Sequence, residues 1–293
     1  MNKTLRNILM GLALLVCAAL LGYAQDTKTD RAVVPLTDPA KPVLIKAEVL
    51  TGSINVKGYE GKEVIVEAKV RERSLTDEDE EVEEDIEEDQ DEKDKASKIA
   101  GMKRIGYAST GLEVEETNNV VSISTESWKH AVDITIQTPR ASSLELHTTN
   151  DGDILVENVS GDFEVENVNG SIALKNVSGN AVVNTVNGDV TVTMTRVTPD
   201  KPMSFRSLNG DVDVTFPADV KASVKMKSQQ GDVYSDFDIN LKPAPQKAEE
   251  VEKSGKGKYR ISFEKYVYGA INGGGPEYVF NTFNGDVYIR KGK

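Results

Sequence analysis

Short runs of alternating apolar and polar residues follow one another along most of the chain, and glycines separate them at regular intervals. Alternation with a period of two is typical of β-strands. The same order of residues recurs around each glycine, as a comparison of Val168–Leu174 with Val186–Val192 shows. Asn-Gly accepts the positive φ angles of a tight turn, so the pattern predicts short strands that each end in such a turn. Five of these glycines stand nine residues apart: Gly152, Gly161, Gly170, Gly179 and Gly188.

Two arrangements of such strands are conceivable. In an antiparallel meander that turns at Asn169-Gly170, Phe163 would pair with Asn176, so each face would mix apolar and amide side chains. Parallel stacking of units 18 residues apart instead places like residues over like, and the sequence therefore predicts an all-β solenoid with about 18–22 residues per coil. The predicted inward columns are Ile154, Ile172, Val190, Val212 and Val233; Val156, Leu174, Val192 and Val214; Phe163, Ala181, Met203 and Val224; Val165, Val183, Phe205 and Met226; and Val168, Val186 and Leu208.

The same alternation defines the limits of the solenoid, which we place at residues 40–293. Residues 40–140 are expected to form its first coils and its cap, with an acidic disordered insertion at about 74–98. A second insertion, a loop rich in Lys, Pro and Glu, is expected at about 242–258. Tyr259–Tyr268 then returns as a strand, and the glycines at 273–275 bend the chain into the last coil.

The first 24 residues have the features of a secretory signal peptide. Lys3 and Arg6 precede an apolar stretch, and Ala24 ends a small-residue cleavage motif. An uncleaved anchor is the alternative, but the apolar stretch is shorter than the roughly 20 residues of a spanning helix. Cys17 lacks the small residue that a lipoprotein signal places before its cysteine, so lipidation is not expected. We predict an exported, secreted chain, periplasmic or at the cell surface, with a linker at 25–39 and no membrane span after signal removal.

The net charge of the chain says little about its binding partners. The formal net charge is −13, but residues 77–94 alone hold 14 of the 48 acidic residues. This tract is expected to be a solvated loop, with loose calcium binding as the alternative. Basic residues do not cluster with aromatic ones, so nucleic-acid binding is not expected.

The order and phase of several segments resemble a known family: Gly52–Tyr59, Val132–Pro139, the serial Asn-Gly-Asp turns, and the closing segment from Gly273 to Val287. Together they resemble the bacterial putative-adhesin family, a domain of unknown function with β-strand repeats that is related to the head domain of putative autotransporter adhesins. The resemblance covers about residues 40–293 outside the two insertions. It implies a flattened two-sheet parallel β-helix and a role in adhesion, and it supplies no catalytic residues. The acidic insertion departs from the family pattern.

Polar residues at the repeated positions are interpreted as structural. One aspartate follows each of several glycines directly, unlike the repeat of calcium-binding β-rolls, so these side chains are expected to cap turns. Ser171 and Asn180 interrupt the series, and we expect no continuous ladder of carboxylates. The aspartates are Asp153, Asp162, Asp189, Asp211, Asp232 and Asp286. Three asparagines beside inward valines, Asn158, Asn167 and Asn176, are expected to mark a bend or bulge and to bond the backbone.

An enzyme remains the alternative function, because polysaccharide lyases also use parallel β-helices. A lyase needs carboxylates and a basic residue that converge on one outward face. The outward column Glu166, Asn184, Arg206 and Lys227 is instead a charge gradient, expected to be solvated surface. His130 and His147 have no partner motif. Trp128 and Tyr268 are expected to cap the core, with a ligand or partner patch as the alternative. We therefore predict no catalytic, cofactor-binding or metal residues and no cofactor, in a structural or adhesive module whose partner is a protein or glycan of the cell envelope.

Overall fold

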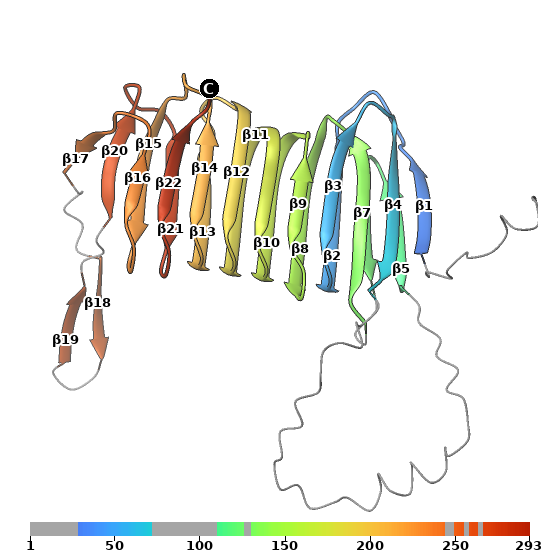
Figure 1. Cartoon of the computed structure of the whole chain (residues 1–293), viewed down its shortest axis with the longest axis horizontal. Helices are drawn as coiled ribbons and strands as arrows, with labels where there is room; N and C mark the ends of the chain where they lie inside the picture. The colour runs from blue at the N-terminus through green and yellow to red at the C-terminus, as the bar shows by residue number, and fades with distance from the viewer. Residues whose placement is uncertain (1–28, 72–109, 126–129, 244–248, 255–257, 263–265) are drawn as a thin grey trace, which may run out of the picture.

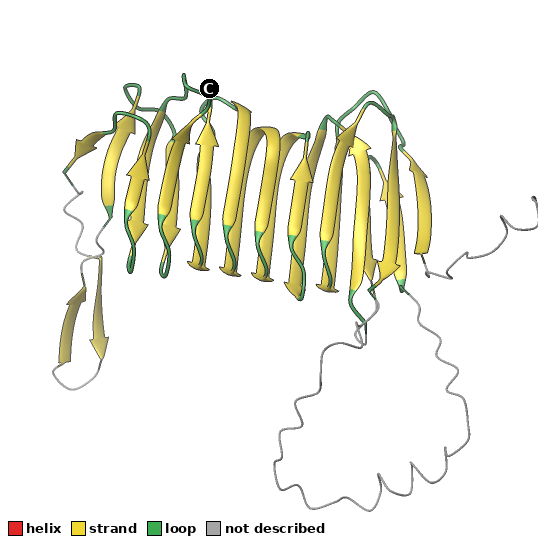
Figure 2. Ribbon diagram, viewed as in Figure 1, coloured by secondary structure: helices red, strands yellow, loops and turns green. Residues whose placement is uncertain are grey.

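The computed structural model describes residues 29–71, 110–125, 130–243, 249–254, 258–262 and 266–293. Within these ranges the regular structure is entirely β, without any helix (Figure 2). Twenty strands belong to one hydrogen-bonded network. The protein is therefore all-β, as its sequence predicts. The predicted signal peptide, the acidic insertion and Trp128 lie outside the described residues.

The network consists of two series of laddered strands that share the long strand β11 (Ile172–Asn187). In pairing order, the first series is β5 (Leu112–Thr117), β6 (Val120–Thr125), β2 (Val43–Thr51), β8 (Ser142–Asn150), β10 (Ser160–Asn169), β11, β13 (Met203–Asn209), β21 (Glu277–Thr282), β15 (Ala222–Ser228), β20 (Val267–Ile271) and β17 (Asn240–Lys242). The second is β1 (Thr29–Pro35), β4 (Glu63–Val70), β7 (Val132–Pro139), β3 (Ile54–Tyr59), β9 (Ile154–Glu157), β11, β12 (Val190–Val197), β14 (Val212–Phe216), β22 (Val287–Lys291) and β16 (Val233–Ser235). We call a strand of the first series and the strand of the second series that follows it a coil.

The strands in the middle of both series are parallel and stack like residues over like. Ile172 pairs with Ile154 on one side and with Val190 on the other, and Val183 lies between Val165 and Phe205 in the same way. All six of these side chains are fully buried. These registers confirm the predicted stacking at a spacing of 18 residues and exclude the antiparallel meander. Side chains of both series fill a single continuous core.

The coils do not all stack in chain order. The last coil, β21 and β22, lies between the coil of β13 and β14 and the coil of β15 and β16. The first coil, β2 and β3, likewise lies between the coil of β6 and β7 and the coil of β8 and β9. Figure 1 shows this as a blue coil between green ones and a dark red coil between orange ones. The predicted column from Val212 to Val233 is thus interrupted by Val287, which pairs with both.

Antiparallel strands lie at the N-terminal end of both series and at the other end of the first series, whereas the second series ends there in β16, which is parallel to β22. At the N-terminal end β4 pairs with β7, β1 with β4, and β5 with β6; at the other end β20 pairs with β15 and β17 with β20. Two predictions are corrected here. Residues 29–35 form β1 rather than a linker, because their backbone pairs with β4 along its whole length. The segment 242–258 is not entirely a loop, because β18 (Glu249–Ser254) pairs with β19 (Lys258–Ser262) in an antiparallel hairpin.

The third inward position of the first series is polar, which corrects another prediction. Val186 and Leu208, expected inside, are 38% and 46% exposed. The strict alternation continues to the end of the strand, so that the neighbouring Thr185 and Ser207 point inward and are nearly buried. Their hydroxyls donate hydrogen bonds to glycine carbonyls of the preceding coil, from Thr185 to Gly170 at 2.9 Å and from Ser207 to Gly188 at 2.8 Å. A buried carbonyl needs a donor, and a valine at this position offers none.

Candidate functional site

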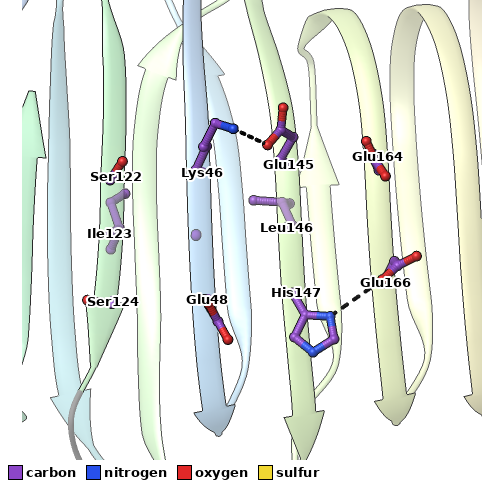
Figure 3. Close-up of a pocket in the computed structure, with 11 residues that line it drawn as sticks. Lys46, Glu48, Ser122, Ile123, Ser124, Glu145, Leu146, His147, Glu164 and Glu166 are labelled. Atoms are coloured by element: carbon purple, nitrogen blue, oxygen red, sulfur yellow. Dashed lines mark ion pairs between the residues drawn. The ribbon is translucent and has the colours of Figure 1, made fainter. Parts of the chain in front are cut away.

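A charged groove of about 430 Å³ lies on the outward face of the first series, over β6, β2, β8 and β10 (Figure 3). Alternation along each strand places one residue in two on this face, while the residues between them enter the core. Its polar lining consists of Lys46, Glu48, Ser122, Ser124, Glu145, His147, Glu164 and Glu166. Four glutamates, one lysine and one histidine therefore stand on the three neighbouring strands β2, β8 and β10, and β6 adds two serines.

The strand registers arrange these side chains in two rows across the sheet. In one row Lys46 pairs with Glu145, and Glu145 with Glu164. The Nζ atom of Lys46 lies 2.6 Å from Oε2 of Glu145, so that this lysine is committed to an ion pair. Glu164 makes no ion pair within the described part of the chain, and the row ends in negative charge.

The second row places a histidine between two glutamates. His147 pairs with Glu48 on one side and with Glu166 on the other. Its Nδ1 atom lies 3.7 Å from Oε2 of Glu166, as Figure 3 shows. Apart from the two ion pairs, these groups are spread over parallel strands in two rows rather than gathered at one point. The arrangement suits the binding of a cationic surface more than a reaction at a single atom.

The second row continues beyond the groove along the predicted charge gradient. Glu166 pairs with Asn184, Asn184 with Arg206, and Arg206 with Asn281, which also pairs with Lys227. The predicted column is therefore confirmed, with Asn281 inserted by the last coil. Sequence reasoning missed Glu48 and His147 in this row. The spacing of glycines could not place them side by side, although both Lys46–Glu48 and Glu145–His147 alternate around a buried residue.

The turns at one edge of the coils carry two further polar ladders. In the first, the Nδ2 group of an asparagine in one coil donates to the Oδ1 atom of the asparagine in the coil stacked before it, at 2.7–3.1 Å. Its members are Asn150, Asn169, Asn187, Asn209 and Asn284. In the second, an aspartate or serine oxygen accepts the backbone N–H of the residue stacked on it, as Asp189 does from Asp211 at 2.8 Å. The aspartates therefore cap turns as predicted, but each one caps the turn of the neighbouring coil rather than its own.

Ser171 interrupts the ladder between Asp153 and Asp189 as expected, but an unbroken run of carboxylates follows it, which corrects the expectation in part. The order of coils places Asp189, Asp211, Asp286 and Asp232 on four successive coils, because the last coil is inserted before Asp232. Each link is a backbone N–H bonded to a carboxylate Oδ1 at 2.8 Å. Asp162 does not belong to this ladder and pairs with Nζ of Lys201 at 2.8 Å.

The three repeated asparagines occupy two different environments rather than one. Asn158 and Asn176 adopt positive φ values of 59° and 54°, and a register shift next to Asn176 confirms the predicted bulge. Asn167 lies at the opposite turn, where its buried amide donates to the carbonyl of Gly152 at 2.9 Å. Asparagine serves at both turns because it tolerates left-handed backbone and can also replace Thr185 or Ser207 as a donor.

Arg71 and Asp133 form a second polar cluster, where β4 and β7 meet the first coil. Nε of Arg71 lies 3.0 Å from Oδ2 of Asp133, and Nη1 donates to the carbonyl of Asp151 at 2.7 Å. The backbone N–H of Ser53 donates to Oδ1 of Asp133 at 3.0 Å. Partial burial raises the pKa of Asp133, but the hydrogen bonds from Arg71 and Ser53 outweigh it, so its pKa lies below the usual value.

The lowered pKa of Asp133 predicts a specific pH dependence of stability. A carboxyl group whose pKa is lower in the folded state stabilises the fold above its unfolded pKa, about 4, and loses this effect as the pH falls through the folded pKa. We expect Asp133→Asn to lower the free energy of unfolding most at about pH 7, with a difference from wild type that shrinks toward about pH 3. Urea unfolding of both proteins across this range measures it. A difference that stays constant would contradict the assignment.

The remaining candidate residues lie apart from the groove. His130 precedes β7 of the second series, whereas His147 lies on β8 of the first. Tyr268 lies on β20 and is half-buried. Among the described residues, no three His, Cys, Asp or Glu side chains are grouped closely enough to hold a metal ion. The described ranges also contain no helix long and apolar enough to span a membrane.

Comparison with solved structures gives low sequence identity over most of the chain. A putative cell adhesion protein from Clostridium sporogenes is 11% identical, with 90% of this chain and 100% of that chain covered and a TM-score of 0.45. A putative adhesin from Bacteroides fragilis is 12% identical, with 90% and 97% covered and a TM-score of 0.41. No curated protein matches the sequence.

A family model matches the part of the chain that carries most of the groove and the repeats. The match extends over residues 111–265 and includes Glu145, His147, Glu164 and Glu166. It covers more than half of the 293 residues. The chain belongs to the Toastrack DUF4097 family.

Proposed function

We propose that this protein is an exported, non-catalytic module of the bacterial envelope that serves as a structural or adhesive surface. The observation that carries the proposal is the group of carboxylates in the two rows on the outward face of the first series, which includes Glu48, Glu164 and Glu166. Neighbouring strands lie about 4.8 Å apart, so the charges form a regular array on a rigid support. Such an array suits a flat, cationic protein or glycan surface.

We further infer that the two series of strands are the two walls of a flattened parallel β-helix with about 18–22 residues per coil. Support comes from the parallel registers in the middle of both series and from the side chains of both series that fill one core. The apolar side chains of each coil pack against those of the next, so the stack is rigid along its length. Rigidity reduces the entropy that a binding surface loses when it meets a partner.

One observation favours an enzyme as a second candidate. His147 lies beside Glu166 on an exposed face, and a histidine with a carboxylate is a common acid–base pair. A polysaccharide-degrading enzyme would use such a pair near a bound sugar chain. Incubation of the purified protein with a panel of acidic glycans separates the two functions. Sustained depolymerisation that Glu166→Gln abolishes would establish the enzyme.

The adhesive function is tested by the retention of the purified mature protein on isolated cell envelopes. We expect Glu48→Gln with Glu164→Gln and Glu166→Gln to lower retention at least about tenfold, since a rim or surface charge acts through electrostatic complementarity. Glu63→Gln, an exposed glutamate on β4 of the second series, is the matched control and should bind as wild type does. Equal retention of all three proteins, or a protein that fractionates with the cytoplasm, would refute the proposal.

A further inference from the structure

The outward face of the first series carries opposite charges at its two ends. The groove at the N-terminal end is rich in glutamates, whereas a second groove over β11, β13, β21 and β15 is lined by Arg206 and Lys227. Lys225 stands on the same face two residues before Lys227. Both grooves lie on parallel strands of one continuous ladder.

The charges are spaced symmetrically about β11. Reading the second row across the sheet gives Glu48, His147, Glu166, Asn184, Arg206, Asn281 and Lys227. Consider a twofold axis that runs parallel to β11 and passes over Asn184. Rotation about it places the same face of a second copy against the first, and the row of the second copy then runs in the opposite order. Glu166 then faces the second copy's Arg206, Glu48 faces its Lys227, and His147 faces its Asn281. The face is thus complementary to itself, as a twofold interface requires.

A line of exposed apolar side chains beside this row supports the same arrangement. Val186 is 38%, Leu208 46% and Phe283 37% exposed, and they stand on β11, on β13 and at the end of β21. Leu208 and Phe283 line the same groove as Arg206 and Lys227. The twofold axis places Val186 against its counterpart and Leu208 against Val168 of the other copy. Burial of this line adds a hydrophobic contribution that the charges alone would not give.

The extent of the face suffices for a stable contact. Seven strands from β2 to β15 with their outward side chains cover about 700 Å² per copy, at a strand spacing of about 4.8 Å. A typical stable interface buries roughly 800 Å² per partner. The symmetry also opposes Lys46 to Lys225, but Lys46 is already paired with Glu145 and Nζ of Lys225 lies 3.9 Å from the ring centre of Tyr266. These interactions offset the like charges.

We propose that this face binds a second copy of the chain, in a face-to-face dimer whose twofold axis follows β11. The inference deepens the proposed adhesive function, on which it rests, because it names the cationic surface that meets the glutamates. The contacts are two Glu166–Arg206 and two Glu48–Lys227 ion pairs around the apolar line. Charge pairs across such an interface fix its register more than its strength, and salt weakens them.

Sedimentation velocity of the purified mature chain over a concentration series tests the dimer. Wild type is expected to show a monomer–dimer equilibrium at low salt that shifts toward monomer at high salt. In the second row, Glu48→Lys with Glu166→Arg leaves only positive residues at the four charged positions, and Arg206→Glu with Lys227→Glu leaves only negative ones. Each double variant alone should dissociate at least about tenfold more readily. An equimolar mixture of the two should restore a dimer that contains one copy of each.

Lys57→Glu, on β3 of the second series, is the control and should dimerise as wild type does. Restoration in the mixture also shows that both variants are folded. If one of them is not, the neutral pair at the same positions replaces it, Glu48→Gln with Glu166→Gln or Arg206→Gln with Lys227→Gln. A wild type that stays monomeric at low salt would overturn the proposal, as would a mixture that does not associate. If retention on envelopes still depended on Glu48 and Glu166 in that case, the adhesive function would remain supported, with a partner other than a second copy.

Discussion

Gly170→Val is expected to lower the free energy of unfolding by about 4 kcal/mol or more, or to abolish cooperative unfolding. A Cβ atom at residue 170 would lie 2.1 Å from the carbonyl oxygen of Gly152 in the preceding coil, a contact that real structures do not contain. It would also lie 2.7 Å from Nδ2 of Asn167, which donates to that same carbonyl. Backbone atoms cannot yield without separating the two coils. Urea unfolding followed by circular dichroism measures the loss.

Asp189→Ala is the matched comparison, because it lies one coil away at the neighbouring turn position. Its carboxylate accepts one hydrogen bond, from the N–H of Asp211, at an exposed site where water can replace it. The expected cost is about 1 kcal/mol. Equal unfolding midpoints for Gly170→Val and Asp189→Ala would mean that the close stacking of glycines is not what fixes the distance between coils.

Phe280→Ala is expected to cost about 3–5 kcal/mol, whereas Phe283→Ala, three residues later, should cost less than about 1 kcal/mol. The ring of Phe280 is fully buried, stacks on Phe205 with centroids 5.5 Å apart, and meets the edge of Phe216 at 6.1 Å. Phe283 is 37% exposed on the outward face.

The comparison separates a core side chain from a surface one of identical type. It should be made at high salt and low protein concentration, so that self-association does not contribute. Thermal and urea unfolding of both variants against wild type give the two differences. A Phe283→Ala variant as unstable as Phe280→Ala would place Phe283 in the core and contradict the alternation assigned to this strand.

The sequence predicts the stacking well wherever the units repeat without interruption. The period of 18 residues places Ile172 between Ile154 and Val190, and it also places Glu166 beside Asn184. The hydrophobic pattern misplaces the last inward position of the first series, where it favours Val186 over Thr185. The reason is that a glycine carbonyl of the neighbouring coil requires a donor there. That requirement arises only once the coils are stacked.

The order of the coils at the two ends cannot be derived from spacing. Glu48 and His147 belong to one row of the charged groove although 98 residues separate them in the chain. A sequential stack would instead place the coil of Glu48 next to the strands that follow it directly. Only the backbone pairing of β2 with β6 and β8 brings the two side chains together.

The displaced first and last coils also determine how the repeat number can change. The first and last coils each lie between two coils from further inside the chain, so a unit duplicated directly before the first coil or after the last would find both edges of that coil already paired. A whole unit inserted between Asn169 and Asn187 would keep every register on both sides. Lineages of this domain should therefore lengthen or shorten only from the middle of the array, which would move the acidic and basic ends of the face apart in steps of one coil.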